Sequence, residues 1–127
     1  MVSFNSITTV AIMALTTLAA PAVENSPSVA TRSESGSLTW FNPGLGACGE
    51  HNGDGDAIVA ISASIFDGQR PCGRNIRVSY KDKSVTVRVV DRCAGCGQND
   101  LDLSPSAFES LTGDKGLGRV QGTWDWA

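Results

Sequence analysis

The chain has 127 residues, which favours a single domain, and its formal net charge is −3 at pH 7. This acidic balance argues against a nucleic-acid-binding module, because such modules are usually basic. Four cysteines in so short a chain indicate two disulfides if the protein is secreted.

The first 22 residues are expected to be a secretory signal peptide. Residues 7–20 are apolar and uncharged, which fits a signal-peptide core and is too short to span a bilayer. Ala20-Pro21-Ala22 offers a cleavage site, although the leading MVSFNS carries no lysine or arginine. Residues 23–35 are rich in Ser, Thr, Pro and charge and are expected to form a flexible linker. The folded domain is then residues 36–127, with no further segment long enough to cross a membrane.

Residues 37–42 (SLTWFN) are expected to form the first strand, which places Thr39 and Trp40 on opposite faces. Residues 44–55 form a loop rich in Gly, Asn and Asp that contains a lone His51. Neither a second histidine nor a ligand spacing accompanies His51, so no metal site is predicted.

The middle of the chain predicts three more strands. Residues 57–62 (AIVAIS) are an apolar run bounded by turn residues, typical of a buried strand, and one helical turn follows at residues 63–66. Residues 75–80 form the next strand, and a hairpin turn leads into residues 85–90, where alternating valines predict one buried face. The basic residues between 70 and 92 are expected to form a solvated strand face.

Residues 85–104 contain the best candidate for a functional site. The long strand ends at Asp91, and a tight Cys93-Ala94-Gly95-Cys96 turn follows. Residues 101–103 form a short strand that carries Asp102. Two carboxylates are thus delivered by two strand ends and separated by a cysteine-bearing loop.

The last part of the chain predicts a helix and a strand. Ser104 is expected to cap the helix, Pro105 takes its first position, and Thr112-Gly113 ends it. Residues 118–126 form the last strand. About six short strands and one definite helix, with strand partners distant in sequence, predict a small closed barrel that is mainly β.

A family resemblance rests on an ordered set of segments: GSLTWF, ACG, VAIS-x3-F, CG, VTVRVVDRC, DLDLSPSAF and a final aromatic strand. This order resembles the double-psi β-barrel of the expansin, barwin and RlpA-like family, and most of all its small fungal single-domain members, the loosenins. The resemblance covers about residues 36–126, and the spacing of DLDLSPSAF from the VVD aspartate is its most specific part. It implies a six-stranded double-psi barrel with one or two short helices and two disulfides.

The resemblance also implies roles for three polar residues. Asp102 matches the aspartate most tightly tied to wall loosening in expansins. Asp91 matches the acidic residue that ends the preceding strand, and Thr39 matches a threonine near the functional aspartate. Bacterial-type expansins have a tyrosine where this chain has Cys93, so one ring that stacks on polysaccharide is missing.

Cysteine pairing is implied by the same resemblance. In expansins and barwin the cysteines that match Cys48 and Cys72 are bonded, which leaves Cys93 with Cys96. A CxxC pair in a cytosolic chain would indicate a redox or zinc site, whereas a structural bridge is favoured in a secreted chain. A zinc site formed by the four cysteines is the lesser alternative, because their spacing is not the usual one.

The favoured function is a secreted, monomeric protein that binds cell-wall polysaccharide (cellulose, hemicellulose or chitin) and loosens it without hydrolysis. Asp102, Asp91 and Thr39 would bind sugar hydroxyls. Either aspartate could instead cap a turn or pair with Arg88 or Arg92. The aromatic residues available for stacking on sugar rings are Trp40, Tyr80, Trp124 and Trp126. The alternative is that most of these rings fill the barrel.

Two other functions remain as alternatives. A glycoside hydrolase or lytic transglycosylase is disfavoured, because hydrolysis usually needs two carboxylates and Asn42 stands where related endoglucanases have the second. Residues 61–64 also lack the histidine of the RlpA-type lytic enzymes. A protease inhibitor or defence protein would act through the loops at residues 44–55 or 67–74. None of these three predicted functions requires a cofactor, a nucleic acid or a membrane.

Overall fold

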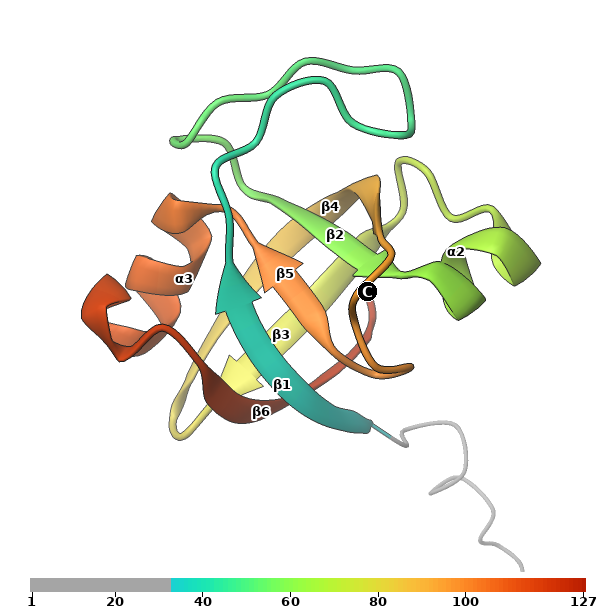
Figure 1. Ribbon diagram of the computed structural model, residues 1–127. Helices are drawn as coiled ribbons and strands as arrows, with labels where there is room; N and C mark the ends of the chain where they lie inside the picture. The colour runs from blue at the N-terminus through green and yellow to red at the C-terminus, as the bar shows by residue number, and fades with distance from the viewer. Residues whose placement is uncertain (1–32) are drawn as a thin grey trace, which may run out of the picture. The chain divides into compact units, whose positions relative to one another are not determined.

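A computed structural model describes residues 33–127, so the expected signal peptide and nearly all of the expected linker lie outside the described residues. Six strands in this part of the chain close into a barrel in the order β1-β5-β2-β4-β3-β6 (Figure 1). The strands are β1 Glu34–Trp40, β2 Ile58–Ser62, β3 Asn75–Tyr80, β4 Lys83–Cys93, β5 Leu101–Leu103 and β6 Val120–Trp126. The helices are α2 Ala63–Gln69, α3 Pro105–Thr112 and the 3-10 helix η1 Lys115–Leu117. The predicted mainly-β barrel, with its short helices and two disulfides, is confirmed.

The short strand β5 determines how the barrel brings distant segments together. It lies between β1, to which it is parallel, and β2, to which it is antiparallel. The other parallel pair is β2 with β4, and the remaining neighbours are antiparallel. Because parallel neighbours need long crossover connections, residues about 60 positions apart become register partners, such as Leu38 and Leu101.

Alternating apolar residues of all six strands fill the barrel interior, as a period of two residues requires. α3 closes against this core through Phe108 and Leu111, which are both buried. The helix begins and ends as predicted, since Ser104 Oγ accepts a hydrogen bond from Ala107 N and Gly113 has a φ of 85°. The core residues on the strands include Leu38, Val59, Ile61, Ile76, Val78, Val87, Val89, Leu101, Leu103 and Trp124.

Several boundaries differ from the sequence-based expectation, and β4, which runs from Lys83 to Cys93 rather than over residues 85–90, is one of them. β1 begins at Glu34, so residues 34–35, which were assigned to the linker, pair with Trp124 and Thr123 of β6. α2 has seven residues rather than one turn. The extension of β1 depends on pairing with β6, a segment distant in sequence, which local composition does not report. No helix within residues 33–127 is long and apolar enough to cross a membrane.

Candidate functional site

The three polar residues implied by the family resemblance lie in one row across four neighbouring strands. Thr39 on β1 pairs with Asp102 on β5, and Asp102 also pairs with Ala60 on β2. Ala60 is in turn the register partner of Asp91 on β4. Register partners point to the same side of a sheet, and Leu38, the neighbour of Thr39, points into the core. The row therefore lies on the outer face of the barrel.

A β-bulge in β4 sets the direction of Asp91. Val59 pairs with Val89, but the next residue on β2, Ala60, pairs with Asp91, so Val90 is an extra residue on β4. Without this insertion, alternation would place Asp91 on the same face as buried Val89. Bulges often re-aim a side chain next to a functional site, and this one moves a carboxylate from the core face to the outer face.

Asp102 is partly buried, and one strong hydrogen bond orients its carboxylate. Thr39 Oγ1 donates to Asp102 Oδ1 at 2.8 Å. Burial raises the pKa of the Asp102 carboxyl above its usual range, because the charged form loses hydration. The hydrogen bond from Thr39 and the charge of Arg119 lower this pKa, whereas the charge of Asp91 raises it slightly. Arg119 carries no sequence signal, because it is an exposed arginine just before β6.

Asp91 has a structural role as well as a place in the row. Its Oδ1 accepts hydrogen bonds of 2.8 Å from the backbone N–H groups of Ala47 and Arg92. Asp91 therefore caps a turn, which was one of the alternatives for its role. The alternative ion pairs are absent, since the guanidinium groups of β4 bind other carboxylates. The two ion pairs within residues 33–127 are Arg88–Glu50 and Arg92–Asp67.

The loop between β1 and β2, residues 41–57, is held against the end of β4. Cys48 N donates a hydrogen bond of 3.1 Å to Val90 O at the bulge. A side chain at Gly46 would place its Cβ 2.4 Å from the same carbonyl oxygen, so only glycine allows this close approach. The two disulfides are Cys48–Cys72 and Cys93–Cys96, the pairing that the resemblance implied.

The three tryptophans differ in burial, and the burial of Trp124 corrects the expectation that its ring binds polysaccharide. Trp124 is 1% exposed, and its Nε1 donates to Asn99 O at 2.9 Å, so its ring is core and cannot stack on a sugar. Trp126 packs edge-on against Trp124, and the guanidinium carbon of Arg74 lies 3.8 Å from its ring centroid. Trp124 therefore follows the alternative in which the rings fill the barrel, whereas Trp126 is partly buried and packs against the core.

Trp40 is separate from the row. It lies on the face of β1 opposite Thr39, packs against the core, and donates from Nε1 to Lys115 O at 3.0 Å. The Lys115 ammonium lies 5.4 Å from the Trp40 ring centroid. The chemistry of the outer face therefore rests on polar groups, with no tryptophan beside Asp102.

The surroundings of Asn42 include a carboxylate that sequence analysis missed. Asn42 Nδ2 donates to both carboxylate oxygens of Asp54, at 3.1 Å each. The sequence gives no signal for this contact, because the closeness of Asp54 to Asn42 depends on how the loop folds back. Within residues 33–127, no group of three or more His, Cys, Asp or Glu side chains is arranged to hold a metal.

Comparison with known proteins gives matches across the barrel. Residues 33–122 match the double-psi β-barrel family described as lytic transglycolase. The Asp f 7 allergen homologue of Arthroderma benhamiae is 37% identical over 82 residues, which cover 60% of this chain but 28% of that protein. The papain inhibitor of Streptomyces mobaraensis is 34% identical over 99 residues, which cover 70% of this chain and 68% of the inhibitor.

Solved structures agree with these sequence matches. The Streptomyces papain inhibitor superposes with a TM-score of 0.68 at 30% identity, covering 76% of this chain and 96% of the inhibitor. A mutant expansin of Clavibacter michiganensis in complex with cellohexaose also gives 0.68, at 27% identity, covering 76% of this chain and 50% of the expansin. The chain spans less than two thirds of the length of the first curated relatives it matches. The family match over residues 33–122, together with the closed six-stranded barrel, shows that the chain belongs to the double-psi β-barrel family described as lytic transglycolase.

Proposed function

We propose that this protein binds cell-wall polysaccharide on the outer face of β1, β5, β2 and β4, and loosens it without hydrolysis. The observation that carries the proposal is the row formed by Thr39 on β1, Asp102 on β5 and Asp91 on β4, with Ala60 on β2 between the two aspartates. The row offers carboxylate and hydroxyl groups at fixed spacing, and all three residues are partly exposed, which suits binding to sugar hydroxyls. The two disulfides suit a protein that acts outside the cell.

Loosening follows from the strength of hydrogen bonds to charged groups. A sugar hydroxyl that donates to a carboxylate gains about 1.5–3 kcal/mol, against about 1 kcal/mol for a bond between neutral groups. A polysaccharide chain that binds Asp102 can therefore exchange a hydrogen bond to a neighbouring chain for one to the protein. Thr39 fixes the carboxylate, so little side-chain entropy is lost on binding. No covalent bond has to break in this exchange.

The arrangement of the carboxylates argues against hydrolysis through the row itself. Asp91 and Asp102 flank Ala60, so their Cα atoms are about 10 Å apart at the usual strand spacing. The retaining mechanism needs two carboxyl groups only about 5–5.5 Å apart, so this spacing disfavours it. The inverting mechanism uses carboxyl groups about 6.5–9.5 Å apart, and its second carboxylate must be free to activate a water. Asp91 also uses one oxygen to hold the loop and the turn in place. A hydrolase would have to free this group from its structural role.

A pull-down on insoluble cellulose, xylan and chitin, with soluble reducing sugar assayed in the same tubes, tests the proposal. We expect binding without sugar release, weakened roughly tenfold or more by Asp102→Asn, since a charged hydrogen bond is lost. Glu109→Gln is the matched control, because it removes one exposed carboxylate on α3. If the unaltered protein releases sugar and Asp102→Asn abolishes this release, the proposal is wrong. The protein would then have the lytic activity for which the family is described.

Protease inhibition is a second candidate, favoured by one exposed apolar residue. Leu45 is 66% exposed on the loop that the Cys48–Cys72 disulfide anchors, and such a residue can enter a pocket on a partner protein. In addition, this chain superposes on 96% of the length of the solved papain inhibitor. If papain is inhibited, we expect Leu45→Asp to abolish the effect and Asp102→Asn to leave it unchanged. The opposite pattern would exclude the loop as the inhibitory surface.

A further inference from the structure

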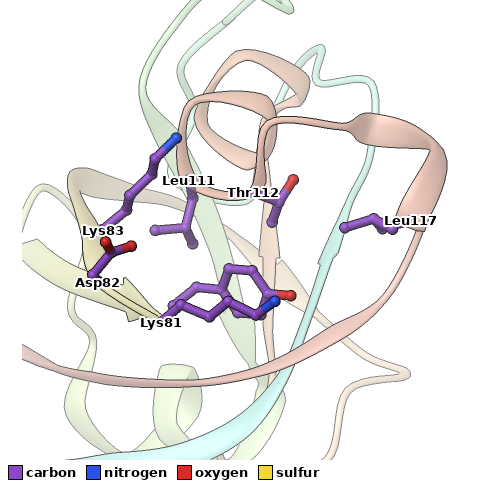
Figure 2. A pocket seen from close by; sticks show the side chains of 7 residues that line it. Lys81, Asp82, Lys83, Leu111, Thr112 and Leu117 are labelled. Carbon is purple, nitrogen blue, oxygen red and sulfur yellow. The ribbon is translucent and has the colours of Figure 1, made fainter.

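A pocket of about 150 Å³ lies away from the polar row, between the β3–β4 hairpin and the α3–η1 segment (Figure 2). In the close view, Lys81, Asp82 and Lys83 come from the hairpin side, while Leu111, Thr112 and Leu117 come from the helical side. The seven lining residues are Tyr80, Lys81, Asp82, Lys83, Leu111, Thr112 and Leu117. Neither the family match nor the proposed function assigns a role to this pocket.

The helical side of the pocket is apolar. Leu111 is buried against the core, whereas Leu117 remains 48% exposed and so offers apolar surface to a ligand. The Thr112 hydroxyl donates a hydrogen bond to Phe108 O at 2.9 Å and accepts one from Asp114 N at 3.2 Å. Because the hydroxyl is used in these bonds, Thr112 offers mainly its methyl group to the pocket. An apolar cavity of about this volume accommodates a benzene ring, so the volume fits a single ring.

The hairpin side of the pocket is cationic. The chain has three lysines. Lys81 and Lys83 line the pocket, and Lys115 lies on η1, which supplies Leu117. Neither of the two ion pairs within residues 33–127 uses a lysine. Asp82 is the single acidic residue in the lining, so the rim keeps an excess of positive charge although the whole chain is acidic.

Lys81 occupies a backbone position at which glycine would be more stable. Residues 81–82 form the two-residue turn between the register partners Tyr80 and Lys83. Lys81 has a φ of 54°, in the left-handed region where hairpin turns prefer Gly or Asn. Its ammonium lies 5.3 Å from the Tyr80 ring centroid, at the pocket. Backbone strain of this kind is common at ligand-binding sites, and at this turn it accompanies a cation beside an aromatic ring.

We propose that this pocket binds a small aromatic carboxylate. The ring would lie between Leu111 and Leu117, and the carboxylate would face Lys81 and Lys83. The opposite orientation is disfavoured, because the C-terminal end of α3 at Thr112 carries partial negative charge that repels an anion. This site is independent of polysaccharide binding on the outer face, which uses other strands and other residues.

Benzoate is the probe, and the readout is amide chemical shifts of the isotope-labelled protein during titration. We expect saturable shifts at residues 80–83 and 111–117. Benzyl alcohol should bind roughly fivefold more weakly, because it lacks the charge that meets the exposed ammonium groups. Benzylamine should bind more weakly still. Equal affinity for benzoate and benzyl alcohol, or the absence of saturable shifts at the pocket, would overturn the proposal.

Lys81→Gly gives the sharpest test, because function and stability are expected to move in opposite directions. The variant should raise Tm by relieving the strained turn, while benzoate binds roughly fivefold more weakly. Lys83→Gln should weaken binding by a similar factor with Tm unchanged. Asp102→Asn is the matched control and should bind benzoate as the unaltered protein does, so failure of the polysaccharide proposal leaves this test intact. Benzoate affinity unchanged in both lysine variants would show that the ammonium groups do not bind the ligand.

Discussion

Thr39 Oγ1 donates a 2.8 Å hydrogen bond to Asp102 Oδ1, joining two residues that are 63 positions apart in the chain. The bond joins β1 to β5, and it partly compensates a carboxylate whose pKa is raised by burial. A partly dehydrated carboxylate lowers the stability of the folded state. Its presence on the outer face fits a residue whose function is to bind a ligand. The first two predictions test this relationship from each side.

Asp102→Asn is expected to make the folded protein more stable at neutral pH. The folded state of the unaltered protein holds the Asp102 proton more tightly than the unfolded state, so its stability falls as pH rises through the raised pKa. Asparagine removes this penalty and still accepts the bond from Thr39. Urea unfolding at pH 7 and at pH 3 should show a gain that shrinks toward zero at the lower pH. The Glu109→Gln control should stay within about 0.5 kcal/mol of the unaltered protein at both pH values.

Thr39→Val is expected to destabilise the protein by about 1 kcal/mol at neutral pH, because the Asp102 carboxylate loses its side-chain donor. The same change should raise the pKa of Asp102 further, since the hydrogen bond from Thr39 lowers it. Carboxyl carbon shifts measured against pH report this pKa directly. Thr86→Val, on the exposed face of β4, is the control. An Asp102 pKa unchanged in Thr39→Val would show that the bond is not formed in solution.

Gly46→Ala is expected to cost about 1–3 kcal/mol, in the range of an overpacked site. The new Cβ would lie 2.4 Å from Val90 O, so the loop must move away from the bulge and from Asp91. Gly53→Ala is the matched control in the same loop, because nothing lies within 4 Å of its Cβ. Thermal unfolding of the two variants checks the difference. Equal Tm values would mean that the loop does not approach Val90.

The two disulfides are expected to differ in their contribution to stability. Cys48–Cys72 spans 24 positions and Cys93–Cys96 spans 3. Chain entropy alone gives about 3.5 kcal/mol for the longer loop and about 2 kcal/mol for the shorter. Replacing each pair with alanine and measuring urea unfolding tests this order. A larger loss of stability in the variant without Cys93–Cys96 would show that this disulfide also stabilises the folded turn after β4, beyond restricting the unfolded chain.

Several elements could be predicted because their signals are local. Alternating valines in β4 and the Ser104-Pro105 cap of α3 depend on neighbours within a few residues, and the structure has both. The pairing of Asp102 with Thr39 followed from resemblance to a family rather than from any local pattern. The roles of Arg119 and Asp54 were missed, because both act on residues brought near by the fold.

The direction of each side chain at the ends of strands needed the tertiary structure. Alternation alone would place Asp91 inside the barrel, and the extra residue Val90 corrects this. Trp124 and Trp126 have the same sequence signal as sugar-stacking rings, and only strand pairing shows that Trp124 is core. The pocket beside Lys81 has no signal in the sequence beyond a hairpin turn, because its walls come from segments about 30 residues apart.

The sequence by itself determined the strand content, the helix after Ser104, the acidic character and the cysteines available for two disulfides. Local hydrogen bonding and side-chain period govern these features, so they can be read from neighbouring residues. The tertiary structure alone decided that Asp91 and Asp102 flank the same residue, Ala60, and that Trp124 is part of the core. Closure of the barrel sets these positions, because the position of each strand is fixed by hydrogen bonds to partners distant in the chain.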